Sequence, residues 1–268
     1  RVHHDVLMGK LAKRIEDKRV LGLVRGYLDA GIMLSGVVVE RHEGTPQGGP
    51  LSPLLANVLL DEVDKELEKR GHAFVRYADD CNVYVRSRRA GERVMELLRR
   101  LYAQLRLQIN ESKSAVAPAS KRQFLGFAFW YGPGSVVRRR LAPKALRRMK
   151  DRVRLITRRT RGRSVQQVCE DLKGYLQGWK QYFHLVETPG VLARLDEWIR
   201  HRLRALQLKQ WKRGRTIYRE LRRRGLSRDT AAKVAAYGRC WWKNSAKGIH
   251  RALPNALVDE LGLPRLAA

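Results

Sequence analysis

The sequence is poor in acidic residues and in cysteine, and it contains no long apolar run. Only 26 of its 268 residues are aspartate or glutamate. Cys81, Cys169 and Cys240 are widely spaced, so neither a disulfide framework nor a zinc site of the C-x-x-C type is indicated. The apolar runs fall well short of the roughly 20 residues that cross a bilayer, and no signal peptide opens the chain. We therefore expect a reducing, cytoplasmic location and no membrane role.

Positive charge is what the sequence has in excess. Lysine and arginine number 56, which gives a formal net charge of +30. Residues 138–268 hold 34 of these cations and 10 acidic residues, whereas residues 1–137 hold 22 cations and 16 acidic residues. Charge of this density repels itself unless a partner neutralises it, which argues against a surface that is merely soluble. The C-terminal half is therefore predicted to bind a polyphosphate backbone.

Residues 1–139 have the pattern of mixed α and β structure. The chain is 44% hydrophobic, enough to bury the core of one or two domains. Apolar spacing together with Gly, Pro and Ser signals predicts alternating elements. The expected helices are one or two over 7–28, one over Pro53–Arg70 with Ser52 as N-cap and Gly71 as stop, and one over Ala90–Leu105. The expected strands are 36–41, a hairpin over Phe74–Val85, 107–109, 115–117, and a hairpin over 123–129 and 136–140.

From Pro143 onward the pattern predicts helices alone. Apolar residues recur at helical spacing, and turn residues separate the stretches. The composition changes near residue 140 and again near residue 212, where we expect domain boundaries. The expected helices are Pro143–Arg159, Val165–Leu185 after an N-cap at Ser164, Val191–Trp211, Thr216–Arg224, Arg228–Tyr237, and a short helix from about Ala252.

Two adjacent carboxylates, Asp79 and Asp80, lie at the centre of the first expected hairpin, where a turn over the pair is chemically reasonable. Like charges side by side favour a counter-ion, and a divalent metal is the obvious one. Metal-assisted phosphoryl chemistry with two ions needs more carboxylates than this pair supplies. An Asp-Asp turn without function explains the same residues, so both interpretations stay open on spacing alone.

The order of four motifs gives a specific resemblance. The motifs are Gly44-Thr45-Pro46-Gln47-Gly48-Gly49-Pro50-Leu51-Ser52-Pro53, Tyr77-Ala78-Asp79-Asp80, Asn110-Glu111-Ser112-Lys113-Ser114, and Phe124-Leu125-Gly126-Phe127. In this order and approximate spacing, they resemble the reverse transcriptase palm of bacterial group II intron proteins. The basic helical part, with Gly174-Tyr175 and Trp179 to Phe183, is similar to the thumb or maturase domain of that family. The ending, with Trp241-Trp242 and Asn244-Ser245, resembles the DNA-binding tail of members without an endonuclease domain.

The resemblance implies an α+β fold: a right-hand polymerase palm, with helices packed on an antiparallel sheet, followed by an all-α thumb and a small helical C-terminal segment. The corresponding domains are 1–139, 140–211 and 212–268. The implied activity is Mg²⁺-dependent RNA-directed DNA synthesis with two metal ions, combined with maturase support of intron splicing. The implied partners are group II intron RNA, a DNA target, a cDNA/RNA duplex and dNTPs, in a bacterial, nucleoid-associated location.

The resemblance also implies roles for individual residues. Asp79 would be a metal ligand, and Asp80 a second carboxylate near the metals and the primer end. Lys113 matches a lysine near the leaving pyrophosphate, where a cation offsets developing charge; by itself it is an ordinary surface lysine. The nucleotide and template site would include Gln47, Gly48, Gly49, Tyr77 and Ala78. A tight strand-to-helix turn explains the glycines of this site equally well. The primer grip would be Phe124, Leu125, Gly126 and Phe127.

Arginine dominates the basic stretches, which suits bidentate contact with phosphates. Aromatic side chains interleave with these stretches; we expect most of them in the core and a few stacked on bases. The predicted nucleic-acid-binding residues are Arg138, Arg139, Arg140, Arg147, Arg148, Arg158, Arg159, Arg161, Arg163, Arg222, Arg223 and Arg224.

The sequence departs from the family at its start. The family's first metal-binding aspartate lies just before the segment that matches residues 1–5, and Asp5 matches a structural position instead. We therefore expect a fragment in which a third carboxylate is missing and which polymerises poorly by itself. The alternatives are a non-catalytic RNA-binding maturase, and a reverse transcriptase of the diversity-generating or CRISPR-associated kind.

Overall fold

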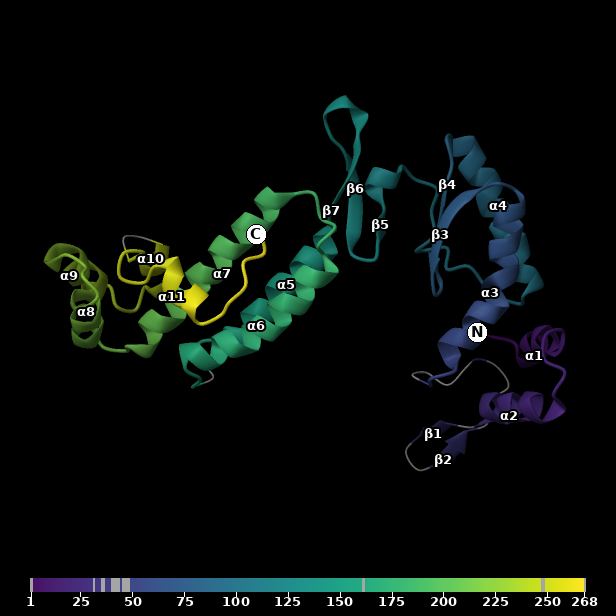
Figure 1. Cartoon of the computed structure of the whole chain (residues 1–268), viewed down its shortest axis with the longest axis horizontal. Helices are drawn as coiled ribbons and strands as arrows, with labels where there is room; N and C mark the ends of the chain where they lie inside the picture. The colour runs from purple at the N-terminus through teal and green to yellow at the C-terminus, as the bar shows by residue number, and fades with distance from the viewer. Residues whose placement is uncertain are drawn as a thin grey trace. The chain divides into compact units, whose positions relative to one another are not determined.

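The computed structural model describes residues 2–30, 32–34, 37–39, 44, 49–160, 162–246 and 249–267, with 32–34 and 37–39 as backbone only. The chain divides into two compact units, Arg1–Phe124 and Leu125–Ala268 (Figure 1). Each unit has its own buried cluster or clusters of apolar side chains.

The first unit alternates helices with short antiparallel hairpins. Strand β1 pairs with β2, and β3 pairs with β4. The elements are α1 (His4–Ala12), α2 (Lys18–Asp29), β1 (Ile32–Leu34), β2 (Val37–Val39), α3 (Ser52–Lys69), β3 (Ala73–Tyr77), β4 (Asp80–Tyr84), α4 (Arg88–Gln104), the 3-10 turn η1 (Ala119–Lys121) and β5 (Gln123–Phe124).

Helix α3 is the centre of this unit. Leu55, Leu59, Val63 and Leu67 recur every four residues and are all buried, so they form one continuous stripe. The stripe packs with α1 and α2, and Phe74, Cys81 and Val83 of the β3–β4 hairpin pack against the same core. Helices α3 and α4 cover one face of that hairpin (Figure 1). The hairpin is therefore a well-supported platform whose turn projects from the core.

The second unit begins with one hairpin and continues as helices. Strands β6 and β7 pair antiparallel from Phe127↔Leu141 to Tyr131↔Val137. The elements are β6 (Phe127–Tyr131), the 3-10 turn η2 (Pro133–Ser135), β7 (Val137–Leu141), α5 (Pro143–Ile156), α6 (Val165–Tyr182), α7 (Pro189–Gln210), α8 (Gly214–Arg223), α9 (Arg228–Ala236), α10 (Trp241–Ala246) and α11 (Asn255–Glu260).

Two apolar clusters support this helical unit. The larger one joins α5, α6 and α7 through residues such as Val153, Leu172 and Ile199, and it includes Val258, Leu263 and Leu266 from the end of the chain. These three helices lie side by side (Figure 1). The smaller cluster joins α8 and α9 to the end of α7 and to residues 249–253. The division of function at residues 139/140 and 211/212 stays a prediction.

Most expected elements are confirmed, with two instructive differences. Ser164 caps α6 in a reciprocal capping box with Gln167, as its sequence position predicts. The N-cap of α3, however, is Leu51, which makes no side-chain capping bond. Ser52 is the first helical residue, and its hydroxyl lies 3.2 Å from the Tyr27 hydroxyl. The prediction of Ser52 as N-cap was therefore wrong by one residue.

The strands expected at 107–109 and 115–117 are also wrong, since both stretches are irregular. Arg106 has a left-handed φ of 54°, and the Leu107 amide donates back to the Tyr102 carbonyl. Asn110 then accepts hydrogen bonds from the backbone amides of Lys113 and Ser114. Local turns thus satisfy backbone groups that a strand would offer to a neighbour.

Candidate active site and nucleic-acid surface

The two adjacent aspartates lie at the tip of the β3–β4 hairpin. Tyr77 pairs with Asp80, so the two-residue turn consists of Ala78 and Asp79, and Asp80 is the first residue of β4. The expected turn at Asp79-Asp80 is therefore one residue too late. Ala78 takes the left-handed φ of 53° that this turn requires, a conformation that costs an alanine about 1–2 kcal/mol. The ladder register, and not the turn preference of aspartate, sets the position.

Both carboxylates face solvent. Among the residues that the structure describes, neither receives a hydrogen bond or an ion pair. Two unpaired like charges on consecutive residues are well suited to a hard divalent cation, which takes oxygen ligands. The described part of the chain contains no cluster of three or more His, Cys, Asp or Glu side chains that could hold a metal by itself. The pair therefore fits part of a ligand set.

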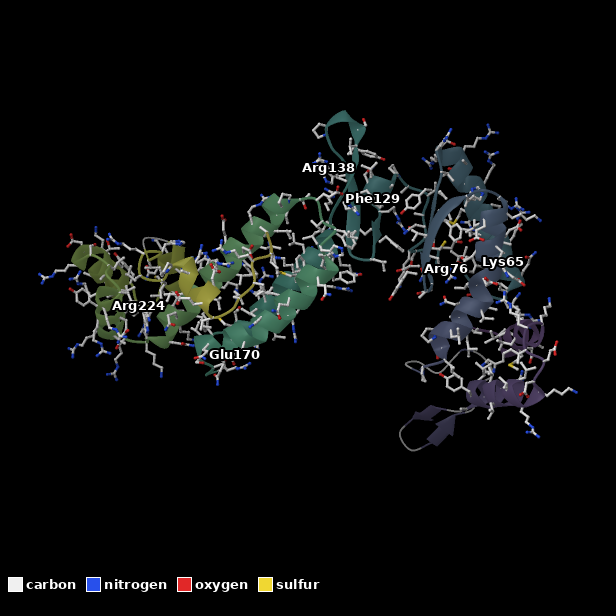
Figure 2. The ribbon with its side chains drawn as sticks, viewed as in Figure 1. Lys65, Arg76, Phe129, Arg138, Glu170 and Arg224 are labelled. Carbon is white, nitrogen blue, oxygen red and sulfur yellow. The ribbon has the colours of Figure 1, made fainter. Side chains whose placement is uncertain are left out.

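An ion pair under the hairpin fixes this turn. Arg76 on β3 (Figure 2) donates from Nε to both carboxylate oxygens of Asp64 on α3, at 2.8 and 3.0 Å. Its Nη1 donates to Asn57 Oδ1 at 2.9 Å and to the Ala78 carbonyl at 3.0 Å. The hydrogen bonds to Asp64 raise the pKa of Arg76, so the guanidinium stays protonated. One guanidinium thus ties the turn, the strand and α3 together, a role that the sequence pattern did not indicate.

Besides the Arg76–Asp64 pair, the inner face of the hairpin carries a partly buried thiol, Cys81, next to the Tyr102 phenol of α4. Burial raises the pKa of the Cys81 thiol to about 11 and that of Tyr102 to about 12. Both groups are therefore neutral at physiological pH, and a neutral thiol is neither a strong nucleophile nor a good metal ligand. The chemistry of the hairpin is confined to its exposed tip.

Part of the glycine-rich loop is described. Gly44 has a left-handed φ of 93°; its amide donates to the Val2 carbonyl at 2.7 Å, and its carbonyl lies 2.7 Å from Nε2 of the buried His4. Gly49 accepts a bond from the Ser52 amide at 3.2 Å and starts the turn into α3. Gln47 and Gly48 lie outside the described residues. The left-handed backbone thus gives Gly44 a structural reason to be glycine.

Lys113 is exposed on the turn that Asn110 organises. Arg122 donates to its carbonyl at 2.7 Å. No hydrogen bond or ion pair within the described residues joins Lys113 to Asp79 or Asp80. The structure therefore leaves its ammonium group available and does not bring it to the carboxylates.

The Leu125–Gly126 turn is held by the helical unit. Both residues are left-handed, with φ of 49° and 80°. Tyr182 donates its hydroxyl to the Leu125 carbonyl at 3.1 Å, and the Ala142 amide donates to the Gly126 carbonyl at 2.9 Å. A Cβ on Gly126 would lie 3.0 Å from the Phe183 ring, so both the left-handed backbone and this close contact favour glycine here. The Phe127 ring packs 5.2 Å from that of Phe183, whereas Phe124 ends β5.

The predicted phosphate-binding arginines fall into two groups. Some have intramolecular partners: Arg139 pairs with Glu187, Arg163 with Asp171, and Arg222 donates to the Leu226 carbonyl. Arg224 (Figure 2) lies over Trp211 at 5.7 Å. Arg161 lies outside the described residues. The exposed remainder comprises Arg138, Arg140, Arg147, Arg148, Arg158, Arg159 and Arg223, of which Arg138 lies over Trp130 at 5.9 Å.

Sequence reasoning missed two buried arginines on α7. Arg200 is 3% exposed and donates to Asp259 at 2.7 Å. Arg204 is 4% exposed and donates to the Leu253 carbonyl at 2.9 Å and to Asn255 at 2.6 Å. One turn earlier, Asp196 accepts the backbone amides of Leu266 and Ala267. The only available signal was the spacing of four between these charged residues. Together they fasten the end of the chain to α7.

Comparison with known families bears on both units. Residues 1–129 match the reverse transcriptase (RNA-dependent DNA polymerase) family, and residues 146–225 match the group II intron, maturase-specific domain. The chain therefore combines a reverse transcriptase domain with a group II intron maturase-specific domain. Reverse transcriptases depend on divalent metal ions, which agrees with the oxygen ligands at the hairpin tip.

Individual relatives match over short stretches. The group II intron-encoded protein LtrA of Lactococcus lactis subsp. cremoris is 41% identical over 64 residues, which are 24% of this chain and 11% of that protein. An uncharacterized 91 kDa protein in the cob intron of Schizosaccharomyces pombe is 37% identical over 67 residues, 25% of this chain and 8% of its own.

The Retron Ec86 reverse transcriptase of Escherichia coli is 31% identical over 86 residues, 30% of this chain and 27% of its own. Across the relatives found, the chain spans between 8% and 27% of the relative's length. Within the described residues, no helix is both long and apolar enough to cross a bilayer.

Proposed function

We propose that this protein is the RNA-directed DNA polymerase of a group II intron and that it also acts as the maturase of its intron RNA. One observation carries the proposal: the exposed Asp79–Asp80 pair sits on a braced hairpin inside the reverse transcriptase match, and a strongly basic maturase match follows. The maturase match favours the intron class over the diversity-generating and CRISPR-associated reverse transcriptases.

In this proposal residues 1–139 are a polymerase palm, residues 140–211 are the thumb, and residues 212–268 contact the DNA target. The β3–β4 hairpin on α3 and α4 has the antiparallel form that a palm requires. The remaining partners are intron RNA, a cDNA/RNA duplex and dNTPs. A bacterial, nucleoid-associated location agrees with these partners.

Asp79 and Asp80 would hold Mg²⁺, with two ions in the complete site. When bound, the ions would lower the pKa of the attacking 3′-hydroxyl and stabilise charge on the leaving pyrophosphate. Arg76 would keep the carboxylates in place through its bonds to Asp64 and to the Ala78 carbonyl. Lys113 would offset charge on the pyrophosphate, and the Leu125–Gly126 turn would position the primer end. Gly49, Tyr77 and Ala78 would lie along the template and the incoming nucleotide.

The maturase role rests on charge. Residues 138–268 carry 34 cations against 10 acidic residues, and the exposed arginines of β7, α5 and α8 have room for phosphates. If six to ten phosphates are neutralised, RNA affinity should fall by about 10³–10⁵ between 50 and 200 mM salt. A flat salt response would contradict this role.

The test of the polymerase role is template-primer extension by the full-length natural protein, with and without EDTA. Asp79→Ala should abolish cDNA synthesis while splicing of the intron RNA persists. Glu92→Ala removes an exposed carboxylate of α4 and serves as the control, with extension unchanged. A second candidate is a non-catalytic maturase, which the basic second unit favours. It predicts splicing support without Mg²⁺-dependent extension by the wild type.

A further inference from the structure

One group of cations in the second unit is organised around tryptophan side chains. It comprises Lys150 and Arg154 on α5, Arg159 just after α5, and Arg202 and Lys209 on α7, with Trp198 on α7 and Trp241 on α10. We call these seven residues the indole–cation cluster. Both indoles are partly exposed, so the cluster reaches the surface.

Each indole has cations over its ring. The guanidinium carbons of Arg202 and Arg154 lie 5.3 and 5.7 Å from the Trp198 centroid, and the Lys150 ammonium lies at 5.9 Å. Lys209 and Arg159 lie 5.1 and 5.5 Å from the Trp241 centroid. These distances are within the range of cation–π attraction, so the cations are held in place before any ligand arrives.

The charge of the cluster is not balanced within the chain. Among the described residues, only Arg154 has a carboxylate partner, Asp151 at 2.7 Å. Arg202 donates to the hydroxyl of Thr157 at 2.7 Å. Burial and the nearby guanidinium groups of Arg159 and Arg154 lower the pKa of Arg202. Arg202, Arg159 and Arg154 therefore repel one another, and an external anion would relieve that repulsion.

We propose that the indole–cation cluster binds the phosphodiester backbone of a nucleic acid. The indoles fix the cations and cover their apolar stems, so less side-chain freedom is lost on binding than for free surface lysines. The guanidinium edges remain able to donate to phosphate oxygens in pairs. The rings of Trp198 and Trp241 are covered by cations, so these two indoles do not stack on bases.

This inference rests on the proposed RNA binding and assigns it to one surface. The test uses the purified 268-residue chain with a transcribed group II intron RNA and a DNA duplex of unrelated sequence, over a series of salt concentrations. The variant K150Q/R154Q removes one lysine and one arginine of the cluster. The control K144Q/R152Q removes one lysine and one arginine from exposed positions of the same helix, outside the cluster.

We expect K150Q/R154Q to lower the slope of log affinity against log salt by about two and the affinity by roughly tenfold. The control should change the slope by less than about 0.5, because it removes distant charge and no phosphate contact. If K150Q/R154Q loses affinity for only one of the two probes, the intron RNA or the DNA duplex, that probe is the nucleic acid that the cluster binds. Circular dichroism melting checks that both variants are folded.

Equal effects of K150Q/R154Q and K144Q/R152Q on RNA binding would overturn the inference. The attraction to phosphates would then come from the overall positive charge of the helix and not from the cluster. No effect of either pair would overturn it as well. In both cases the wild type still binds RNA, so the proposed function survives. If the wild-type chain shows no salt-dependent RNA binding, the proposed maturase role fails first.

Discussion

The two units have opposite electrostatic needs. The first carries its candidate chemistry on two unpaired carboxylates at an exposed turn, which favour a cation. The second carries cations clustered on indoles, most of which have no carboxylate partner among the described residues, and these cations favour a polyanion. Among the residues that the structure describes, the two carboxylates have no cationic partner and most cations of the indole–cation cluster have no carboxylate partner. A metal-bound nucleotide together with a bound RNA would provide the cation for the carboxylates and the polyanion for the basic side chains. Both are present in the polymerisation reaction that we propose.

The units share one structural device. Arg76 with Asp64 in the first unit, and Arg200 with Asp259 in the second, are poorly exposed pairs that join segments distant in sequence. The six tryptophans at 130, 179, 198, 211, 241 and 242 all belong to the second unit. Tryptophan fluorescence therefore reports on one unit and circular dichroism on both, so mutations in the two units can be told apart.

The largest effect on stability is expected for Arg76→Met. It leaves Asp64 as an uncompensated, poorly exposed charge, which costs about 3–5 kcal/mol. The circular dichroism transition should shift while the tryptophan transition does not, because the cores of the units are separate. The double variant R76M/D64L should recover most of the loss, since an apolar pair can replace a buried ion pair. A shifted tryptophan transition would show that the units unfold together.

The corresponding change in the second unit is Arg200→Met. We expect a loss of about 1–3 kcal/mol, less than for Arg76, because Asp259 keeps its bond to Arg265 and Asp196 keeps two backbone amides. Here the tryptophan transition should shift. If this variant costs more than Arg76→Met, the end of the chain is more tightly coupled to α7 than these bonds indicate.

Gly126→Ala should destabilise the second unit by about 1–2 kcal/mol, because the left-handed backbone disfavours alanine, and contact of its Cβ with Phe183 would add to this. Tyr182→Phe removes only one hydrogen bond and should cost about 0.5–1.5 kcal/mol. Guanidinium unfolding followed by tryptophan fluorescence measures both. Tyr237→Phe, at an exposed tyrosine, is the control and should be neutral. A neutral Gly126→Ala would mean that the turn adopts another conformation.

The smallest effect is expected for Ala78→Gly. Glycine relieves the left-handed strain of about 1–2 kcal/mol and adds about 0.5–1 kcal/mol of unfolded-state entropy. The free energy of unfolding, measured by circular dichroism, should therefore rise by up to about 1 kcal/mol. A loss of stability would show that the methyl group of Ala78 makes a contact that outweighs the strain.

The sequence predicted what depends on apolar spacing. The stripe Leu55, Leu59, Val63 and Leu67 located α3, and Gly71 ends it with a φ of 68°. The family resemblance, carried by four short motifs, is confirmed by the two family matches. The candidate roles of Asp79, Lys113 and the basic arginines stay predictions.

What the sequence did not predict depends on polar partners distant along the chain. Nothing in the sequence distinguished Arg76 from the other arginines, because its pairing with Asp64 is a tertiary contact. The sequence likewise did not indicate that the Ser52 hydroxyl lies beside Tyr27. Asp80 became a strand residue because the register pairs it with Tyr77. Periodicity records which side chains are buried and not which donor meets which acceptor, so caps, turn positions and buried ion pairs needed the structure.

The central claim is that the candidate chemistry belongs to the first unit and that the intron RNA binding of the maturase role belongs to the second. The most direct test compares the intron RNA affinity of Asp79→Ala with that of the wild type. The affinity is measured at the same salt concentration as the extension assay in which the variant loses cDNA synthesis. Because the change removes no phosphate contact, the affinity should stay within about twofold of the wild type. A tenfold or larger fall in affinity would contradict the claim and place RNA binding at the carboxylate hairpin itself.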